Sequence, residues 1–216
     1  MNEPSPRVVA AFDFDGTLTR RDSMFPFLVE IAGIGRVSRA LLADAVRIAR
    51  VAAGRGDRDV VKANLIARVT TGLDWSDVHK RGQAYARLLV AQRLRPEALH
   101  RLRWHLAQGH DVVIVSASLD AYLHDVAELL GVGAVLCTTF ERDELGRVTG
   151  RLVGGNCRGP EKATRLREHL GRELGGATVE LWAYGDSSGD RELLAMADRP
   201  VRVTKRGRLL DVTRRG

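Results

Sequence analysis

Residues 8–19 constrain the fold of this chain more than any other stretch. They open with the apolar run Val-Val-Ala-Ala-Phe, which has the length and composition of a strand buried on both faces, as in a parallel sheet. Two aspartates, Asp13 and Asp15, follow with a Gly-Thr turn. Because ligands of open α/β sheets bind outside the carboxyl ends of the strands, we expect this pair to face a ligand.

Two carboxylates at one strand end can divide the work of phosphoryl transfer. Side chains two positions apart on an extended chain point to the same side, so Asp13 and Asp15 can face one substrate. One carboxylate can attack phosphorus as a nucleophile while the other moves a proton. A Mg²⁺ ion would offset their charge and that of the phosphate. The alternative is a solvated, aspartate-rich turn after an ordinary strand.

The composition is that of an ordinary globular protein. The 216 residues, 44% hydrophobic and 28% charged, suffice for one domain with an insert or a small second domain. No run is long enough to span a bilayer, and residues 1–6 lack the apolar core of a signal peptide. The two cysteines, Cys137 and Cys157, suggest no disulfide framework, so we expect a cytoplasmic protein.

The net charge of +7 raises the question of an anionic partner. The basic residues are scattered and only 5% of residues are aromatic, which leaves little material for base stacking, so we expect no nucleic-acid partner. Residues 36–53 carry apolar residues on one helical face and arginines on the other. This pattern is typical of a membrane-surface helix or, as we expect here, of a packed helix with a solvated basic face.

The remaining pattern predicts an α/β fold with an all-helical insert after the first strand. Between Asp22 and Arg93 we expect helices only, over residues 25–32, 36–53, 59–69 and 75–89. From Pro96 onward helices alternate with short apolar strands, which indicates a parallel sheet with right-handed crossovers. The expected strands are residues 111–115, 134–137, 179–184 and 200–203, with a hairpin around 143–146 and a loose basic tail from 205.

Polar residues follow the predicted strands along the whole sheet. The hydroxyl of Ser116 and the amides of Ala117 and Ser118 can hold phosphate oxygens near the start of a helix. Lys162, in the first turn of a later helix, can supply a positive charge to phosphate and nucleophile. Asp186 and Asp190 follow another strand. Each has an ordinary explanation alone, as a cap, an exposed lysine or a plain turn, but their joint occurrence in this order is difficult to reach by chance.

With these residues the chain resembles the haloacid dehalogenase superfamily of phosphohydrolases over almost its whole length. The first motif is Asp-Phe-Asp-Gly-Thr at residues 13–17, the last is Gly-Asp-Ser-Ser-Gly-Asp at 185–190, and Ser116 and Lys162 stand between them. The resemblance implies a Rossmann-like core with a parallel sheet, residues 1–18 and 95–216. Residues 19–94 would form a helical cap like that of subfamily IB, the phosphoserine-phosphatase-like group.

The resemblance also implies a role for each aspartate. Asp13 would be the nucleophile that forms an aspartyl phosphate, and Asp15 the general acid and base. Mg²⁺ would be held by Asp13, the backbone carbonyl of Asp15, and Asp186, with Asp190 orienting that shell. In the cap, Asp22 lies where the family has a glutamate that can meet a substrate ammonium. Arg68 resembles the family arginine that pairs with a substrate carboxylate, and both are candidate substrate-selecting residues.

The expected function is a Mg²⁺-dependent phosphomonoesterase acting on a small phosphorylated metabolite. Ser-Ala-Ser at residues 116–118 and Gly189 depart from the phosphoserine phosphatases, which carry Ser-Gly-Gly and an asparagine there. Residues 155–159 look more like the broader IB hydrolases, which include histidinol-phosphate phosphatases. The substrate is therefore left as phosphoserine-like or histidinol-phosphate-like. The alternatives are a phosphatase for lipid-headgroup or nucleic-acid-end phosphates and a non-catalytic phospholigand-binding module; the sequence leaves the oligomeric state open.

Overall fold

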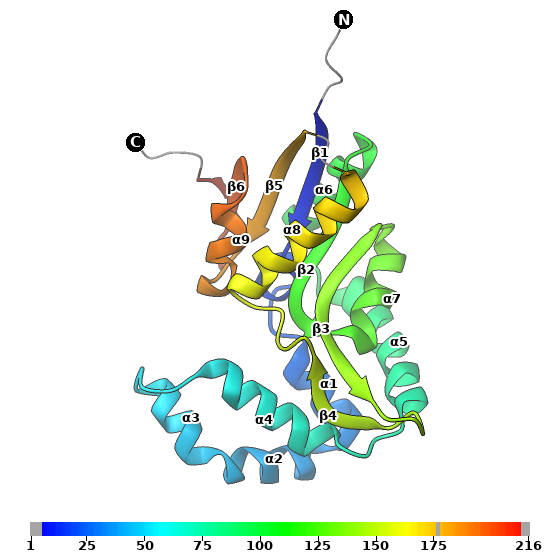
Figure 1. The fold of residues 1–216 in the computed structure, drawn as a ribbon, viewed down its shortest axis with the longest axis vertical. Coiled ribbons are helices and arrows are strands. Elements are labelled where there is room, and N and C mark those ends of the chain that lie inside the picture. Colours follow the sequence, from blue (N-terminus) through cyan, green and yellow to red (C-terminus); the bar gives the residue numbers. More distant parts are fainter. Residues whose placement is uncertain (1–5, 176–177, 213–216) are drawn as a thin grey trace, which may run out of the picture.

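Seven strands form one sheet in the order β4-β3-β2-β1-β5-β6-β7 within residues 6–175 and 178–212, which the computed structural model describes (Figure 1). Five central strands run parallel, and the two edge strands, β4 (Val148–Val153) and β7 (Leu209–Asp211), pair antiparallel. The predicted parallel α/β sheet is confirmed. The five parallel strands are β1 (Arg7–Phe12), β2 (Asp111–Leu119), β3 (Ala134–Arg142), β5 (Val179–Gly185) and β6 (Arg199–Val203).

Helices cover both faces of the sheet because successive residues of the central strands point to opposite sides. Val9 and Ala11 of β1 face the apolar cluster formed with α8 (Pro160–Leu174) and α9 (Arg191–Ala195). Ala10 and Phe12 face a larger cluster on the other side, which includes residues of α6 (Pro96–Ala107) and α7 (Asp120–Leu130). Burial on both faces explains why β1 is apolar throughout its second half.

The segment between β1 and β2 contains helices and, among the described residues, no strand, as the sequence predicts. Three of its helices lie beyond the carboxyl ends of the central strands, at the bottom of Figure 1: α2 (Ile34–Ala43), α3 (Ala45–Ala52) and α4 (Arg58–Thr70). Its other α-helices are α1 (Met24–Ala32), α5 (Trp75–Gln92) and α6 (Pro96–Ala107). The division into a core and a cap at residues 19 and 94 stays a prediction.

Helix α5 packs directly on α7 of the sheet layer. A Cβ atom at Gly82 would lie 1.8 Å from the carbonyl oxygen of Ala121, so only glycine allows the two helix backbones to approach this closely. This contact fixes one end of the helical insert to the sheet layer, beside the strand β2 that leads into α7.

Three sequence predictions differ from the structure. The helix predicted over 36–53 is two helices, α2 and α3, separated at Asp44, whose backbone (φ −105°, ψ 12°) leaves the helical conformation while its buried carboxylate accepts hydrogen bonds from Arg47 and Arg68. Strand β2 continues to Leu119, with a register shift between Ser116 and Leu119. The tail predicted to be loose from 205 forms β7 against β6, while residues 213–216 lie outside the described part of the chain.

Candidate active site

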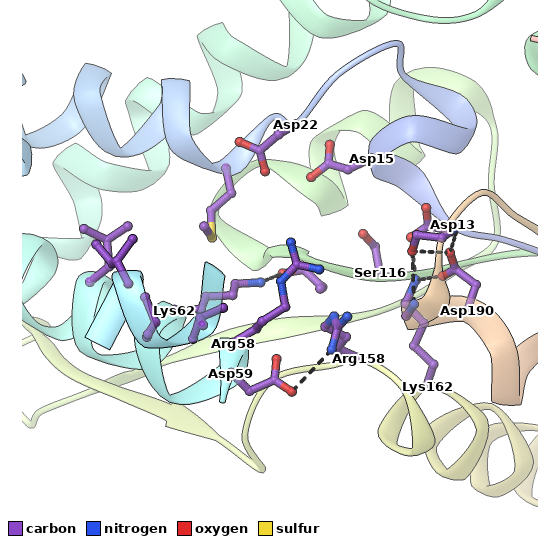
Figure 2. A pocket seen from close by; sticks show the side chains of 18 residues that line it. Asp13, Asp15, Asp22, Arg58, Asp59, Lys62, Ser116, Arg158, Lys162 and Asp190 are labelled. Carbon is purple, nitrogen blue, oxygen red and sulfur yellow. Dashed lines mark hydrogen bonds and ion pairs between the residues drawn. The ribbon is translucent and has the colours of Figure 1, made fainter. Parts of the chain in front are cut away.

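A buried lysine joins two aspartates at the carboxyl end of β1 (Figure 2). Lys162, in the first turn of α8, donates to Asp13 Oδ1 at 2.5 Å and to Asp190 Oδ1 at 2.6 Å. All three residues are buried, at most 5% exposed. Burial by itself would lower the pKa of Lys162, but Asp13 and Asp190 raise it above its ordinary value. The lysine therefore stays charged and compensates the negative charge that burial leaves beside it.

Asp15 lies beside this ion-paired group and is held by hydrogen bonds from both the helical segment and the sheet. Its carboxylate accepts from the amide of Ser23 at 3.0 Å and from the hydroxyl of Ser118 at 2.8 Å. Burial, with the nearby charge of Asp22, raises the pKa of Asp15 to about 6. A carboxyl group with a pKa near neutrality can both give and accept a proton, which is the requirement for a general acid and base.

The turn between Asp13 and Leu18 requires glycine. Gly16 has a φ of +84°, which side-chain-bearing residues rarely adopt, and a Cβ there would lie 2.4 Å from Asp186 Oδ2. The close approach brings the loop after β5 against the loop after β1. As a result, carboxylate oxygens of Asp13, Asp186 and Asp190 lie within 4.8 Å of one another.

This donor set fits a magnesium ion. Mg²⁺ prefers oxygen ligands and is commonly bound through one or two carboxylates together with substrate phosphate. Asp13 and Asp186 offer such carboxylates at the mouth of the strand ends, whereas both oxygens of Asp190 are engaged. Asp190 accepts from Lys162 with one oxygen and from the amide and hydroxyl of Ser187, at 3.0 and 2.9 Å, with the other. Asp190 thus orients the lysine and the loop.

The residues predicted to hold phosphate lie where the pairing of β2 with β3 is interrupted. Ser116 and Ala117 both line the same cavity as Asp13 and Asp15. The hydroxyl of Ser116 accepts a hydrogen bond from the amide of Ser118 at 3.1 Å, while the hydroxyl of Ser118 donates to Asp15. Ser118 therefore holds the carboxylate of Asp15 in place, a contact that the sequence analysis did not predict for its side chain.

The cavity above these residues has a volume of about 410 Å³ and is closed on one side by the helical segment. The wall of the cavity away from the aspartates contains both charged and apolar side chains. Figure 2 shows Asp22, Arg58 and Lys62 on the helical side, with Arg158 between Arg58 and Lys162. Apolar side chains fill the rest of that wall: Met24, Ile48, Val51, Val61 and Leu65. A substrate of this cavity would have its phosphate at the aspartates and its remaining atoms between charged and apolar groups.

Helix α4 is tied to the loop before α8 by polar contacts. Lys62 Nζ donates to the carbonyl oxygen of Ala117 at 2.5 Å and to Asn156 Oδ1 at 2.9 Å, and Asn156 Nδ2 donates to Asp59 at 2.6 Å. Burial lowers the pKa of Lys62 to about 8. Sequence analysis missed these residues because they come from segments 94 positions apart, and no local pattern distinguishes them from exposed charges.

The two candidate substrate-selecting residues have different surroundings. Asp22 lines the cavity, and its carboxylate also accepts from the amide of Phe25 at the start of α1. Arg68 is absent from the residues that line the cavity and instead pairs with Asp44 at 3.2 Å, with 47% of its side chain exposed. The structure thus brings together every predicted core residue and Asp22, but does not bring Arg68 to them.

A protein-family model described as haloacid dehalogenase-like hydrolase matches residues 10–195, from the middle of β1 to the end of α9. The chain belongs to this family. Its site is of the phosphatase type within the family, because carboxylates occupy both positions of the first motif, Asp13 and Asp15. The haloacid dehalogenase resemblance stated from the sequence is confirmed.

Relatives with curated descriptions cover different shares of the chain. Protein CicA of Caulobacter vibrioides is 36% identical over 88% of this chain and 83% of its own length. A histidinol-phosphatase of Neisseria meningitidis serogroup C is 28% identical over 46% of each chain. Among solved structures, a substrate-bound phosphoserine phosphatase superimposes with a TM-score of 0.62 at 17% identity, covering 94% of this chain and 87% of that one. This last likeness establishes the shared fold.

Proposed function

We propose that this chain hydrolyses the phosphomonoester of a small metabolite with Mg²⁺ as cofactor. The observation that carries the proposal is the buried group of Lys162, Asp13 and Asp190 beside an independently held Asp15. The group presents a carboxylate nucleophile, its compensating charge and a proton-transfer residue within one cavity. A module that only binds a phosphorylated ligand has no need of a second carboxylate with a pKa near 6.

Each residue has a defined step in this reaction. An oxygen of Asp13 attacks phosphorus, the bond from phosphorus to the leaving oxygen breaks, and Asp15 gives that oxygen a proton. Asp15 then takes a proton from water, whose oxygen attacks the aspartyl phosphate and releases phosphate from Asp13. Ser116 and the charge of Lys162 hold phosphate oxygens through both steps. Bound Mg²⁺ would supply further neutralisation of the phosphate charge.

The mixed wall of the cavity favours a substrate that carries both a charge and an apolar body. Asp22 faces the space where a substrate ammonium or imidazolium can lie, and Ile48, Val51 and Leu65 offer contacts for a ring or aliphatic chain. Phosphoserine has no apolar body to use them. We therefore propose an amine-bearing phosphate of the histidinol-phosphate type, consistent with the description of the Neisseria meningitidis relative.

Removing the metal should stop the reaction completely. Phosphate release from a generic aryl phosphate should disappear in excess chelator and return when Mg²⁺ is added, and Ca²⁺ should inhibit because it prefers more ligands and looser geometry. Asp186→Ala should lose both activity and the response to Mg²⁺. The absence of a side chain at Gly16 lets the Asp186 carboxylate lie close to Asp13, where both can bind the ion. Full activity in chelator would contradict the proposed cofactor, and release of no phosphate from any substrate would contradict the proposed function.

Two arginines of α4 provide a matched test of the cavity wall. Arg58 lines the cavity, whereas Arg68 pairs with Asp44 outside it. We expect Arg58→Ala and Asp22→Asn each to raise KM for the preferred metabolite about ten- to a hundredfold, because a charged hydrogen bond contributes roughly 1.5–3 kcal/mol. Arg68→Ala should leave that KM unchanged. If Arg58→Ala and Asp22→Asn raised KM for the aryl phosphate as much as KM for the metabolite, these two residues would not select the substrate.

A further inference from the structure

We propose that the outward face of α2 and α3 docks on the surface of an anionic lipid bilayer. We call this the outer cap face and define it by five residues at its centre: Ile34, Arg39, Leu42, Val46 and Arg50. The proposal rests on the exposure, the charge and the position of these residues, and it does not depend on the substrate of the enzyme.

The apolar residues of the outer cap face are exposed to an unusual degree for residues in regular helices. The exposed fraction is 63% for Ile34 and 75% for both Leu42 and Val46. Helix α3 contributes no buried residue at all. Isolated exposed apolar residues are common on proteins, but three large ones on two consecutive helices indicate a surface that another body covers.

The opposite faces of α2 and α3 pack against the rest of the chain. Val37 and Ala40 of α2 are buried, and Ile48 and Val51 of α3 line the catalytic cavity. Both helices contact α4 on that inner side, and in Figure 1 they form the lower edge of the molecule. The outer cap face is therefore directed away from the rest of the chain, and no other described element lies over it.

Its charge has a single sign. Residues 34–56 contain five arginines and one acidic residue, Asp44, whose side chain is 2% exposed and already paired with Arg47 and Arg68. The next acidic residue, Asp57, lines a pocket with Arg50 and Arg55, and its carboxylate accepts from the amides of Asp59 and Val60 at the start of α4. Within the described part of the chain, no carboxylate forms an ion pair with Arg39, Arg50 or Arg55. Positive charges beside exposed leucine and valine match the headgroups and the upper acyl region of an anionic bilayer.

Other occupants fit less well. A second copy of this chain would place arginines against arginines with no exposed carboxylate on the face to pair them. A nucleic acid would satisfy the arginines but leave Leu42 and Val46 against phosphates. No helix in the described residues is long and apolar enough to cross a membrane, so the contact proposed is one at the surface.

The test is flotation of the full chain with lipid vesicles. Binding should be strong to vesicles that contain phosphatidylglycerol, weak to phosphatidylcholine alone, and should decrease with salt. Arg39→Gln with Arg50→Gln should weaken binding about thirtyfold, because each arginine near an anionic surface contributes about a fivefold factor. Leu42→Gln with Val46→Gln should weaken it by about tenfold or more, through lost apolar contact.

Matched controls come from exposed residues on other elements. Leu145→Gln removes an apolar side chain that is 73% exposed in the β3–β4 turn, and Arg103→Gln removes an exposed arginine of α6. Both should leave vesicle binding unchanged. All four test positions are exposed, so every variant should keep the circular dichroism spectrum and the aryl-phosphate activity of the parent.

Several results would overturn the proposal. One is equal binding to neutral and anionic vesicles, or no binding to either. Another is binding that survives both double substitutions. Affinity for duplex DNA that these substitutions abolish, without affinity for vesicles, would assign the face to nucleic acid. A concentration-dependent dimer that Leu42→Gln with Val46→Gln dissociates, again without vesicle binding, would assign it to a second copy of the chain.

Discussion

Replacing Asp13 by asparagine should reduce phosphate release to background while the fold survives. An amide nitrogen or oxygen is a poor nucleophile and a weaker Mg²⁺ ligand than a carboxylate, so the first step loses its attacking atom. Asparagine keeps the shape of the side chain and can still accept a hydrogen bond from Lys162. Turnover should be measured with an aryl phosphate in saturating Mg²⁺, and folding by the denaturant midpoint of the metal-free chain.

Asp15→Asn is the matched control because it should fail at a different step. The nucleophile remains, and an aryl leaving group needs little protonation, so the first step should still produce aspartyl phosphate. Hydrolysis of that intermediate should be slow, since water then lacks its base, and overall turnover should fall by ~10²–10⁴-fold. Rapid mixing should then show a burst of the aryl product in Asp15→Asn and none in Asp13→Asn. Turnover of Asp13→Asn within tenfold of the parent would contradict its assignment as nucleophile.

The central site could be predicted because its residues follow strand ends. Parallel topology places the carboxyl ends of strands at one edge, so Asp13 and Asp186, just past β1 and β5, and Ser116, in the carboxyl-terminal part of β2, had to converge once the sheet was predicted. Lys162 could be added because Gly159 and Pro160 mark the start of its helix. For these residues, secondary structure and order along the chain are sufficient to place the side chains.

The cavity wall could not be predicted, because it depends on how helices pack. The apolar residues of 36–53 recur at regular helical spacing, so the sequence gives no sign that the helix ends at Asp44. In the structure α2 ends there, and the buried carboxylate of Asp44 binds Arg47 and Arg68. Arg68 pairs with Asp44 and is not among the residues that line the cavity. Lys62 reaches Ala117 only because α4 lies across the end of β2, a contact that no sequence spacing encodes. Substrate selection therefore stays less predictable than the chemistry.

Replacing Lys162 by methionine should cost more stability than any other single change at the site. Methionine has similar length and no charge, so the carboxylates of Asp13 and Asp190 would stay buried, 5% and 1% exposed, without their shared cation. Breaking a buried ion pair by removing one partner typically costs about 3–5 kcal/mol. The free energy of unfolding should be measured by denaturant titration in chelator. Lys80→Met, at an exposed position of α5, is the control and should change it little.

A second substitution separates lost charge compensation from poor packing. Asp190→Asn in the Lys162→Met background removes one of the two unpaired charges, so the double variant should be more stable than Lys162→Met alone. In the parent background the same Asp190→Asn substitution should be destabilising, because Lys162 then loses a partner at 2.6 Å. If methionine merely packed badly, Asp190→Asn would destabilise both backgrounds equally. A change of sign between backgrounds would therefore show that the lysine holds two buried negative charges at the strand ends, the condition that Asp13 needs to remain an ionised nucleophile.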